Sequence, residues 1–334
     1  MALPAVASRS ILAFLVFQCA PAASAAAQAP VRVACAGPAT SLPVIDSARL
    51  MRDVAALADD SMEGRKVGTA AGARARAFVL AQFRVMGLDT LPRGALESFA
   101  APGGRGNGAN VIGLLPGRTR PGRIILVTAH YDHLGVQGGA IYNGADDNAS
   151  GTAAMMAIAA WFHANPPQNT MMFVALDGEE EGLLGASALV RDHAVPIDSV
   201  LLNVNLDMVS RSVNRQLFAV GPARYPGLLP YLSAVACRAR VTLMLGHDKG
   251  WSGSEDWTME SDQGVFYGAG IPFVYFGVED HADYHKPTDD VSRIDPGFFA
   301  AATRAIALFV AQVDANPAAA ASARGSTGKV KGPL

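Results

Sequence analysis

Four short apolar segments, each leading into histidine or carboxylate residues, are the feature of this sequence that most constrains its fold. They span residues 124–130, 171–180, 201–207 and 271–278, and the last runs on to His285. Short apolar runs between helical patterns are typical of buried strands in a mostly parallel sheet, where ligands gather just beyond the strand C-termini. We therefore predict that segments far apart in the sequence bring one cluster of histidines and carboxylates together, as an enzyme site requires.

The composition favours one large domain that acts on small or peptide-like molecules. The chain has 334 residues, and 50% of them are hydrophobic, which is enough for a large core. Predicted strands alternate with helical patterns, so we expect an α/β, three-layer domain with a mostly parallel, mixed central sheet flanked by helices. The formal net charge is −2, and Lys and Arg are scattered. This excludes the electrostatic footprint typical of proteins that bind nucleic acid or anionic membranes.

The first 27 residues have the pattern of an export signal. Arg9 precedes the apolar run 11–17, and small residues follow at 23–27. Cleavage after Ala25 or Ala27 would give a secreted or periplasmic protein without a membrane anchor. The membrane-anchor alternative is weaker because a bilayer-spanning helix needs about 20 apolar residues. A lipoprotein signal at Cys19 is a further alternative, but Phe17 and Gln18 are bulky where lipid-attachment sites favour small residues.

Removal of the signal leaves two cysteines, Cys35 and Cys237. An oxidising compartment would permit a disulfide between them. Two free thiols fit the sequence equally well, because nothing in it shows that the two residues meet. Without CxxC spacing, the pair makes a poor metal site.

Periodicity also sets the expected organisation of the chain. Helical spacing predicts helices over residues 45–57, 70–86, 150–165, 182–193, 225–240 and 298–313, with Asn148 or Ser150 as N-cap of the third. The strand pattern at 110–115 precedes the strand that starts at residue 124 almost directly, which favours a hairpin. We expect the catalytic domain over residues 28–315. Residues 316–334 are rich in Ala, Gly, Ser and Lys, which predicts a disordered tail.

Taken from the residues alone, the strand ends offer two imidazoles and three carboxylates. Each has an ordinary structural explanation, such as a buried core histidine or a solvated glutamate, but their joint occurrence favours a metal site. One tetrahedral catalytic zinc uses fewer protein ligands, so two zinc ions, or another divalent transition metal, sharing one carboxylate fit the count. Such ions lie about 3.5–4 Å apart, lower the pKa of a water towards about 7 and polarise a substrate carbonyl. The five groups are His130, Asp146, Glu180, Asp207 and His285.

These segments resemble a known family, the cocatalytic two-zinc exopeptidases that include bacterial secreted aminopeptidases, glutamate carboxypeptidase and glutaminyl cyclase. The likeness runs from about residue 50 to about residue 310, and its motifs occur in the family's order. They are Ala-His-Tyr-Asp-His-Leu-Gly at 129–135, Gly-Ala-Asp-Asp-Asn-Ala-Ser-Gly at 144–151, Glu-Glu-Glu-Gly-Leu-Leu-Gly at 179–185, Asn-Leu-Asp-Met at 205–208 and Tyr-His-Lys-Pro-Thr-Asp at 284–289.

The resemblance implies a role for each ligand. Asp146 would bridge the two ions, and a cis peptide would follow it, joining Asp146 to Asp147. His130 and Asp207 would complete one ion. Glu180 and His285 would complete the other.

The resemblance also implies supporting residues. Glu179 would be the general base, which passes a proton from the attacking water to the leaving nitrogen. Asp132 would orient the His130 imidazole, and Asp289 would support the loop of His285. In this alignment Glu181 is the variable, solvent-facing glutamate. His133, His247 and His281 are rivals for the histidine roles.

The sequence departs from the family at one motif. The family's frequent Ser-Asp-His is Ser-Asp-Gln at 261–263 here, and no tyrosine stands just before it. Some relatives use a tyrosine at that position to bind the tetrahedral intermediate. The residue that stabilises this intermediate is therefore not identified by the motif.

The pattern leads to a secreted metallo-exopeptidase, foremost an aminopeptidase acting on peptides. A glutaminyl-cyclase-like acyltransferase keeps similar ligands around one zinc and is the enzyme alternative. A non-catalytic binding ectodomain on the same fold is a third hypothesis, which the retained ligands and base disfavour. The segment 246–263 carries Trp251 and Trp257. These tryptophans are expected either to line the substrate pocket or to pack the loop onto the domain.

Overall fold

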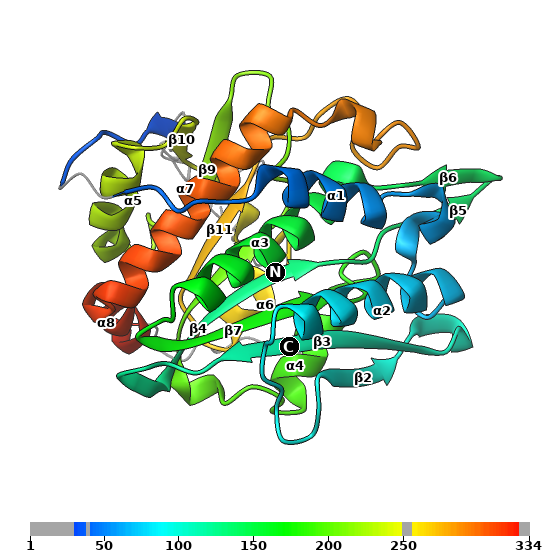
Figure 1. Ribbon diagram of the computed structural model, residues 1–334, viewed down its shortest axis with the longest axis horizontal. Coiled ribbons are helices and arrows are strands. Elements are labelled where there is room, and N and C mark those ends of the chain that lie inside the picture. Colours follow the sequence, from blue (N-terminus) through cyan, green and yellow to red (C-terminus); the bar gives the residue numbers. More distant parts are fainter. Residues whose placement is uncertain (1–29, 38–40, 249–255, 327–334) are drawn as a thin grey trace, which may run out of the picture.

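A nine-stranded mixed sheet forms the centre of the computed structural model, which describes residues 30–37, 41–248 and 256–326 (Figure 1). The strand order is β1-β10-β9-β11-β8-β4-β7-β3-β2. A separate small ribbon pairs β5 (Gly135–Gln137) with β6 (Ala140–Tyr142). The strands of the large sheet are β1 (Val31–Arg32), β2 (Leu96–Ala100), β3 (Asn107–Leu115), β4 (Arg120–His130), β7 (Asn169–Leu176), β8 (Val200–Leu206), β9 (Gln216–Val220), β10 (Thr242–Leu245) and β11 (Phe273–Gly277).

The four apolar segments of the sequence form four adjacent parallel strands in the middle of this sheet. β11 pairs with β8, β8 with β4, and β4 with β7, each in parallel. Every residue of β7 and β8 is buried, so neither strand alternates between a core face and a solvent face. Their carboxyl ends therefore open at one edge of the sheet. The predicted fold class, a mixed sheet flanked by helices, is confirmed.

Helices cover both faces of the sheet and give three layers. The larger core joins the sheet to α1 (Ser47–Leu57), α2 (Ala70–Val85), α3 (Gly151–Ala164), α5 (Leu229–Ala236) and α7 (Pro296–Ala315). Figure 1 shows α1, α3 and α7 together in front of the sheet. The second core lies against α4 (Leu184–Arg191) and α6 (Gln263–Gly268) on the other face. α7 is long and apolar enough to cross a membrane, but 78% of its apolar window is buried inside the fold.

The helices begin where the sequence supplies a cap. Asp46 caps α1, Thr69 caps α2 and Asp295 caps α7, each through a side-chain oxygen that accepts backbone N–H groups. For α3 the Asn148 side chain accepts the N–H of Gly151 at 2.8 Å, whereas Ser150 makes no capping bond. Of the two expected caps, Asn148 thus fills the role.

The predicted hairpin between residues 110–115 and the strand at 124 is wrong. β3 pairs with β2 and β7, both antiparallel, and β7 lies between β3 and β4. The short connection after β3 crosses the start of β7 instead, where the backbone N–H of Arg118 donates to the carbonyl of Pro167. A side chain at Gly117 would stand 2.5 Å from the Asn169 carbonyl carbon, so glycine permits this crossing.

The prediction of a disordered tail is wrong for its first part. Residues Ala318–Ser326 form helix α8, in which Ala320 and Ala323 are buried against the larger core. The Arg324 guanidinium donates to the carbonyl oxygens of Ile197 and Gly270. The segment is ordered although it lacks bulky apolar side chains, because its small alanines pack closely against the core and Arg324 adds hydrogen bonds to neighbouring loops. Residues 327–334 lie outside the described residues, as does the predicted signal at 1–27.

Of the two alternatives for the cysteines, the structure has the bridged one. Cys35 follows β1 at the edge of the sheet, Cys237 directly follows α5, and a disulfide joins them. The bridge spans a sequence separation of 202 residues, so it ties the N-terminal segment to the far half of the domain. Cross-links that close long loops restrict the unfolded chain most.

Candidate metal centre

Four parallel strands deliver the candidate ligands to one edge of the sheet. β4 ends at His130, β8 is followed directly by Asp207, and the segment after β7 carries Glu179 and Glu180. The chain runs from β4 to β7 in one direction along the sheet and from β8 to β9 in the other. Neighbouring strands whose connections leave in opposite directions form the crevice in which open α/β sheets bind ligands.

His130 and Asp207 form the first half of the centre. The His130 ring is 1% exposed, and its Nε2 lies 3.3 Å from Oδ1 of Asp207. Asp132, at the end of the same segment, has its Oδ1 3.6 Å from Nδ1 of His130. The same oxygen accepts the backbone N–H of Glu179 at 3.1 Å. Asp132 therefore lies beside the histidine, and it holds the backbone of the segment that carries the expected base.

The carboxylate of Asp147 stands between the two halves. Its Oδ1 lies 3.5 Å from Nε2 of His130, and its Oδ2 lies 3.1 Å from Nε2 of His285. Each oxygen therefore faces a different histidine. Oδ2 is buried and has no hydrogen-bond partner among the described residues. A shared carboxylate in a two-metal site needs this arrangement.

Glu180 and His285 form the second half. Oε2 of Glu180 lies 3.2 Å from Nε2 of His285, and Oε1 lies 2.6 Å from Nδ1 of His133. Burial raises the pKa of Glu180, but the hydrogen bonds from His133 and His285 outweigh it and hold this pKa far below its usual value. Glu180 is therefore an anion at neutral pH, as a metal ligand must be.

The spacing of these atoms fits zinc. Two ligand atoms bound at 2.0–2.1 Å to one tetrahedral zinc are about 3.3 Å apart. The distances from the Nε2 of each histidine to the nearby carboxylate oxygens are 3.3 and 3.5 Å for His130 and 3.1 and 3.2 Å for His285. The donors are imidazole nitrogens and carboxylate oxygens, which zinc prefers. Two groups of residues with converging donor atoms also occur at these positions, one with His130 and Asp207 and one with Asp147 and Glu180.

The expectation that Asp146 faces the other ligands is wrong. Its carboxylate is fully buried and accepts hydrogen bonds from Ser210 N at 2.8 Å, Ser210 Oγ at 2.7 Å and Ser150 Oγ at 3.1 Å. His281 Nε2 lies 3.1 Å from its other oxygen, so this rival histidine belongs to Asp146 and not to the metal ligands. Asp147 occupies the predicted bridging place, and the cis peptide joins Asp147 to Asn148, one residue later than expected.

The local backbone explains the shift by one residue. Residues Ala145–Ser150 form a π-helical turn in which Asp147 and Asn148 depart from helical φ and ψ. Adjacent carboxylates in such a turn point to different neighbours. Asp289, in the His285 loop, accepts the backbone N–H groups of Asp146 at 3.1 Å and of Asp147 at 3.0 Å. Asp289 thus joins the loop of His285 to the loop of the bridging carboxylate.

Glu179 faces the space next to the first half of the centre. Its side chain groups with His130 and Asp207, and burial raises its pKa well above the usual value. A raised pKa suits a group that must accept a proton and release it again. Burial also raises the pKa of Asp262 to about 8, and both of its oxygens are buried without a hydrogen-bond partner among the described residues. Glu181 instead pairs with Lys66 and Arg105 and stays partly exposed.

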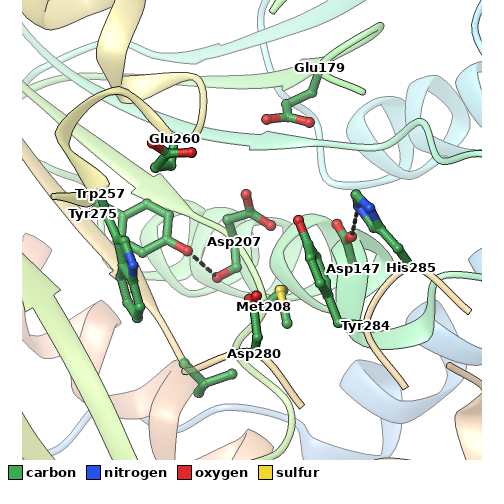
Figure 2. A pocket seen from close by; sticks show the side chains of 11 residues that line it. Asp147, Glu179, Asp207, Met208, Trp257, Glu260, Tyr275, Asp280, Tyr284 and His285 are labelled. Atoms are coloured by element: carbon green, nitrogen blue, oxygen red, sulfur yellow. Dashed lines mark hydrogen bonds and ion pairs between the residues drawn. The ribbon is translucent and has the colours of Figure 1, made fainter. Parts of the chain in front are cut away.

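A cavity of about 310 Å³ opens beside these residues. Figure 2 shows Trp257 and Tyr275 on one side of it and His285 with Tyr284 on the other. The Tyr284 ring stacks on His285 with ring centres 3.9 Å apart. Trp257 stacks on His247 at 3.8 Å and contacts Phe218. Trp257 therefore both lines the cavity and packs its loop, whereas Trp251 lies outside the described residues.

Comparison with known families shows to which family the chain belongs. The model of Peptidase family M28 matches residues 110–310. The chain belongs to peptidase family M28. The matched stretch contains all the candidate ligands discussed above, and it confirms the resemblance seen in the sequence motifs.

Individual relatives agree with this family. A probable zinc metalloprotease of Pyrenophora tritici-repentis is 36% identical over 111 residues, 32% of this chain and 25% of the relative. Aminopeptidase YwaD of Bacillus subtilis is 38% identical over 106 residues, 31% of this chain and 22% of the relative. The chain thus spans a quarter or less of the length of these two relatives.

Solved structures share the fold. BSAP, a zinc aminopeptidase from Bacillus subtilis, superposes with a TM-score of 0.66 at 17% identity, over 82% of this chain and 96% of that chain. Porphyromonas gingivalis glutaminyl cyclase superposes equally well, with a TM-score of 0.66 at 16% identity, over 81% of this chain and 99% of that chain. One fold therefore carries proteins with two different reactions.

Arg65 is a residue of this M28 site that the sequence motifs do not identify. Its guanidinium is fully buried and donates to the carbonyl oxygens of Tyr131 at 2.7 Å, Leu57 at 2.8 Å and Gly144 at 2.9 Å. Burial lowers its pKa to about 10, which leaves it charged at neutral pH. The only signal in the sequence is that Arg65 stands between Gly64 and Gly68, two glycines that indicate a turn.

The two adjacent aspartates should differ in their effect on stability. We expect Asp146→Ala to lower the free energy of unfolding of the metal-free protein by about 3 kcal/mol, because it breaks several buried hydrogen bonds to a charged group. Asp147→Ala should cost less than about 1 kcal/mol, since it removes a carboxylate crowded by others. Denaturant unfolding with a chelator at pH 7 measures both. A larger loss for Asp147→Ala would contradict the assignment of Asp146 as the structural member.

Proposed function

We propose that this chain is a secreted or periplasmic zinc-dependent exopeptidase, foremost an aminopeptidase, with Glu179 as general base. The observation that carries the proposal is the Asp147 carboxylate, whose two oxygens face two different histidines at 3.5 and 3.1 Å. One carboxylate between two zinc-type ligand sets is the core of a two-metal hydrolase site. Membership of peptidase family M28 supports a peptide substrate.

The residues divide into three roles in this proposal. His130, Asp207 and Asp147 would hold one zinc, and Asp147, Glu180 and His285 the other. Two bound zinc ions would lower the pKa of a water and polarise the scissile carbonyl. Glu179 accepts the proton of the attacking water and donates it to the leaving nitrogen, and its raised pKa suits both transfers.

The lining of the cavity supports action at the amino terminus of a peptide. Its charged residues are carboxylates and His285, including Glu260 and Asp280 outside the ligand set, and no Lys or Arg lines it within the described ranges. A carboxypeptidase needs a cation to hold the terminal carboxylate of its substrate. Carboxylates instead favour a protonated amine. The named aminopeptidases among the relatives and solved structures agree with this polarity.

Export rests on two features. The pattern at residues 1–27 is that of a cleaved signal. The Cys35–Cys237 disulfide is typical of an oxidising compartment outside the cytoplasm.

A glutaminyl-cyclase-like acyltransferase is the second candidate, because that enzyme class shares this fold. It keeps similar ligands around one zinc. The number of zinc ions per chain and the products formed from peptides therefore separate the two reactions. A purely binding role would leave the base and the ligand set without a purpose.

The assignment of Glu179 as the general base is tested by comparing two glutamates of the same run, Glu179 and Glu181. We expect Glu179→Gln to keep its metal while turnover of peptide substrates falls by roughly 100-fold or more, because general-base catalysis contributes about 10²–10⁴. Glu181→Gln is the matched control and should retain activity, since Glu181 pairs with Lys66 and Arg105 instead of facing the site. Steady-state kinetics with zinc content measured on the same samples decides. Loss of activity in the Glu181 variant alone would move the base by two residues.

Metal analysis tests the two-ion part. Wild-type protein saturated with zinc and freed of excess should hold two zinc ions per chain by plasma-emission analysis. Asp147→Asn should weaken both, because only this carboxylate faces both halves, and His285→Ala should weaken one. A wild-type ratio of one would overturn the two-ion proposal and favour the cyclase.

Trp257 tests whether the cavity is the substrate pocket. If it is, Trp257→Ala should change the ranking of substrates that differ in their first side chain, because the indole forms part of the cavity wall. Trp161→Ala is the control, since Trp161 lies on α3 and packs on Phe162. Rates over a peptide library with both variants give the answer. Equal rankings in wild type and Trp257→Ala, at intact metal content, would leave only the packing role.

A further inference from the structure

His133 is a buried histidine at the centre that the proposed reaction does not use. It lies three residues after His130, and its ring is 1% exposed. Its Nδ1 lies 2.6 Å from Oε1 of Glu180 and 3.8 Å from Oδ2 of Asp147. Its Nε2 is buried and has no hydrogen-bond partner among the described residues. A buried imidazole aimed at a ligand carboxylate requires an explanation.

The distances distinguish a hydrogen bond from shared metal coordination. Two ligand atoms on one tetrahedral zinc are about 3.3 Å apart. The contact between Oε2 of Glu180 and His285 has this spacing, at 3.2 Å. The contact between Oε1 and His133, at 2.6 Å, is too short for it and has the length of a charge-assisted hydrogen bond. The two oxygens of Glu180 therefore have different partners.

The fold holds the His133 ring in this place from two sides. Gly144 packs against the ring, and a Cβ there would lie 2.5 Å from its Cγ and Cδ2. Gly144 also has φ +55°, which favours glycine. The Arg65 guanidinium bonds the carbonyls of Tyr131 and Gly144 and so fixes the segments before and beside the ring. The ring of His285 meets His133 edge to face, with centres 5.8 Å apart.

We propose that His133 is a positioning residue for the second zinc: its Nδ1–H donates to Oε1 of Glu180, which leaves Oε2 turned towards His285. The inference rests on the proposed two-zinc function and adds a residue to it. Residues that orient a metal ligand in this way typically contribute 10–100-fold to metal affinity. The competing explanation is that His133 is itself a ligand, because its Nδ1 converges with Asp147 and Glu180.

Two amides of different length separate these explanations. In His133→Asn the amide nitrogen stands where Nδ1 stood and can donate to Glu180, but a neutral amide is a poor zinc ligand. In His133→Gln the same amide lies one methylene further out, at the place of Nε2. We expect His133→Asn to bind the second zinc within about threefold of wild type. His133→Gln and His133→Ala should bind it about 10–100-fold more weakly, while the first zinc is unaffected.

Zinc bound per chain across a series of chelator-buffered zinc concentrations measures both affinities without any activity assay. His163→Ala, an exposed histidine on α3, is the control for losing an imidazole. If His133→Ala does not fold, as judged by thermal unfolding, the comparison of Asn with Gln carries the test.

The outcomes are distinct. Equal weakening in the Asn and Gln variants would show a direct ligand and overturn the positioning role. A wild type with two zinc ions and a Gln variant of unchanged affinity would overturn this inference alone. A wild type with one zinc would overturn the two-ion function and this inference with it.

Discussion

Crowded negative charge at the carboxyl edge of four parallel strands is the constraint on which the rest of this structure depends. The carboxylates of Asp147, Glu180 and Asp207 are largely buried: Asp147 lies beside both His130 and His285, Asp207 beside His130, and Glu180 beside His285. Glu179 stands beside His130 and Asp207. Carboxylates packed this closely repel one another, and burial removes the water that would screen them. Without compensating cations such a cluster lowers stability. A site of this kind is built to bind positive charge.

The protein supplies part of that compensation and leaves the rest to the metal. Arg65 brings one fixed positive charge beneath the loops, and it is placed by carbonyl groups instead of by a carboxylate partner. Its charge acts on Asp132, Asp147, Glu180 and Asp289 at a distance. Within the described part of the chain Arg65 forms no ion pair with any of these carboxylates, since it donates to backbone carbonyls instead. The carboxylates therefore stay available to bind a metal. Backbone N–H groups of Asp146 and Asp147 donate to the carboxylate of Asp289. The N–H and the hydroxyl of Ser210 donate to the carboxylate of Asp146.

The hydrophobic pattern of the sequence is sufficient to predict the site where a regular strand ends at a candidate ligand. The strands that deliver His130, Asp207 and the Glu179–Glu180 pair are mostly apolar because both faces of the sheet are covered, so the sequence predicts them and their common edge. The short strands β1, β9 and β10, which form one side of the sheet, are not among the predicted elements. The prediction of a hairpin between β3 and β4 is wrong because the short connection between two strands does not reveal that a later strand, β7, lies between them. That is a long-range pairing, which local pattern does not contain.

The choice between Asp146 and Asp147 shows where sequence reasoning stops. The two residues are identical and adjacent, and they lie in a turn of irregular φ and ψ, so no repeat assigns one of them to the cluster. Their roles come from residues distant in the chain: Ser210 captures the carboxylate of Asp146, and Asp289 holds both backbone amides so that Asp147 is left facing His130 and His285. Asp147 is available as the proposed shared carboxylate because the carboxylate of Asp146 already has its hydrogen-bond partners. The same reasoning applies to the two histidines of this loop. His281 lies against Asp146 and so does not face the centre, whereas His285 lies against Asp147 and does.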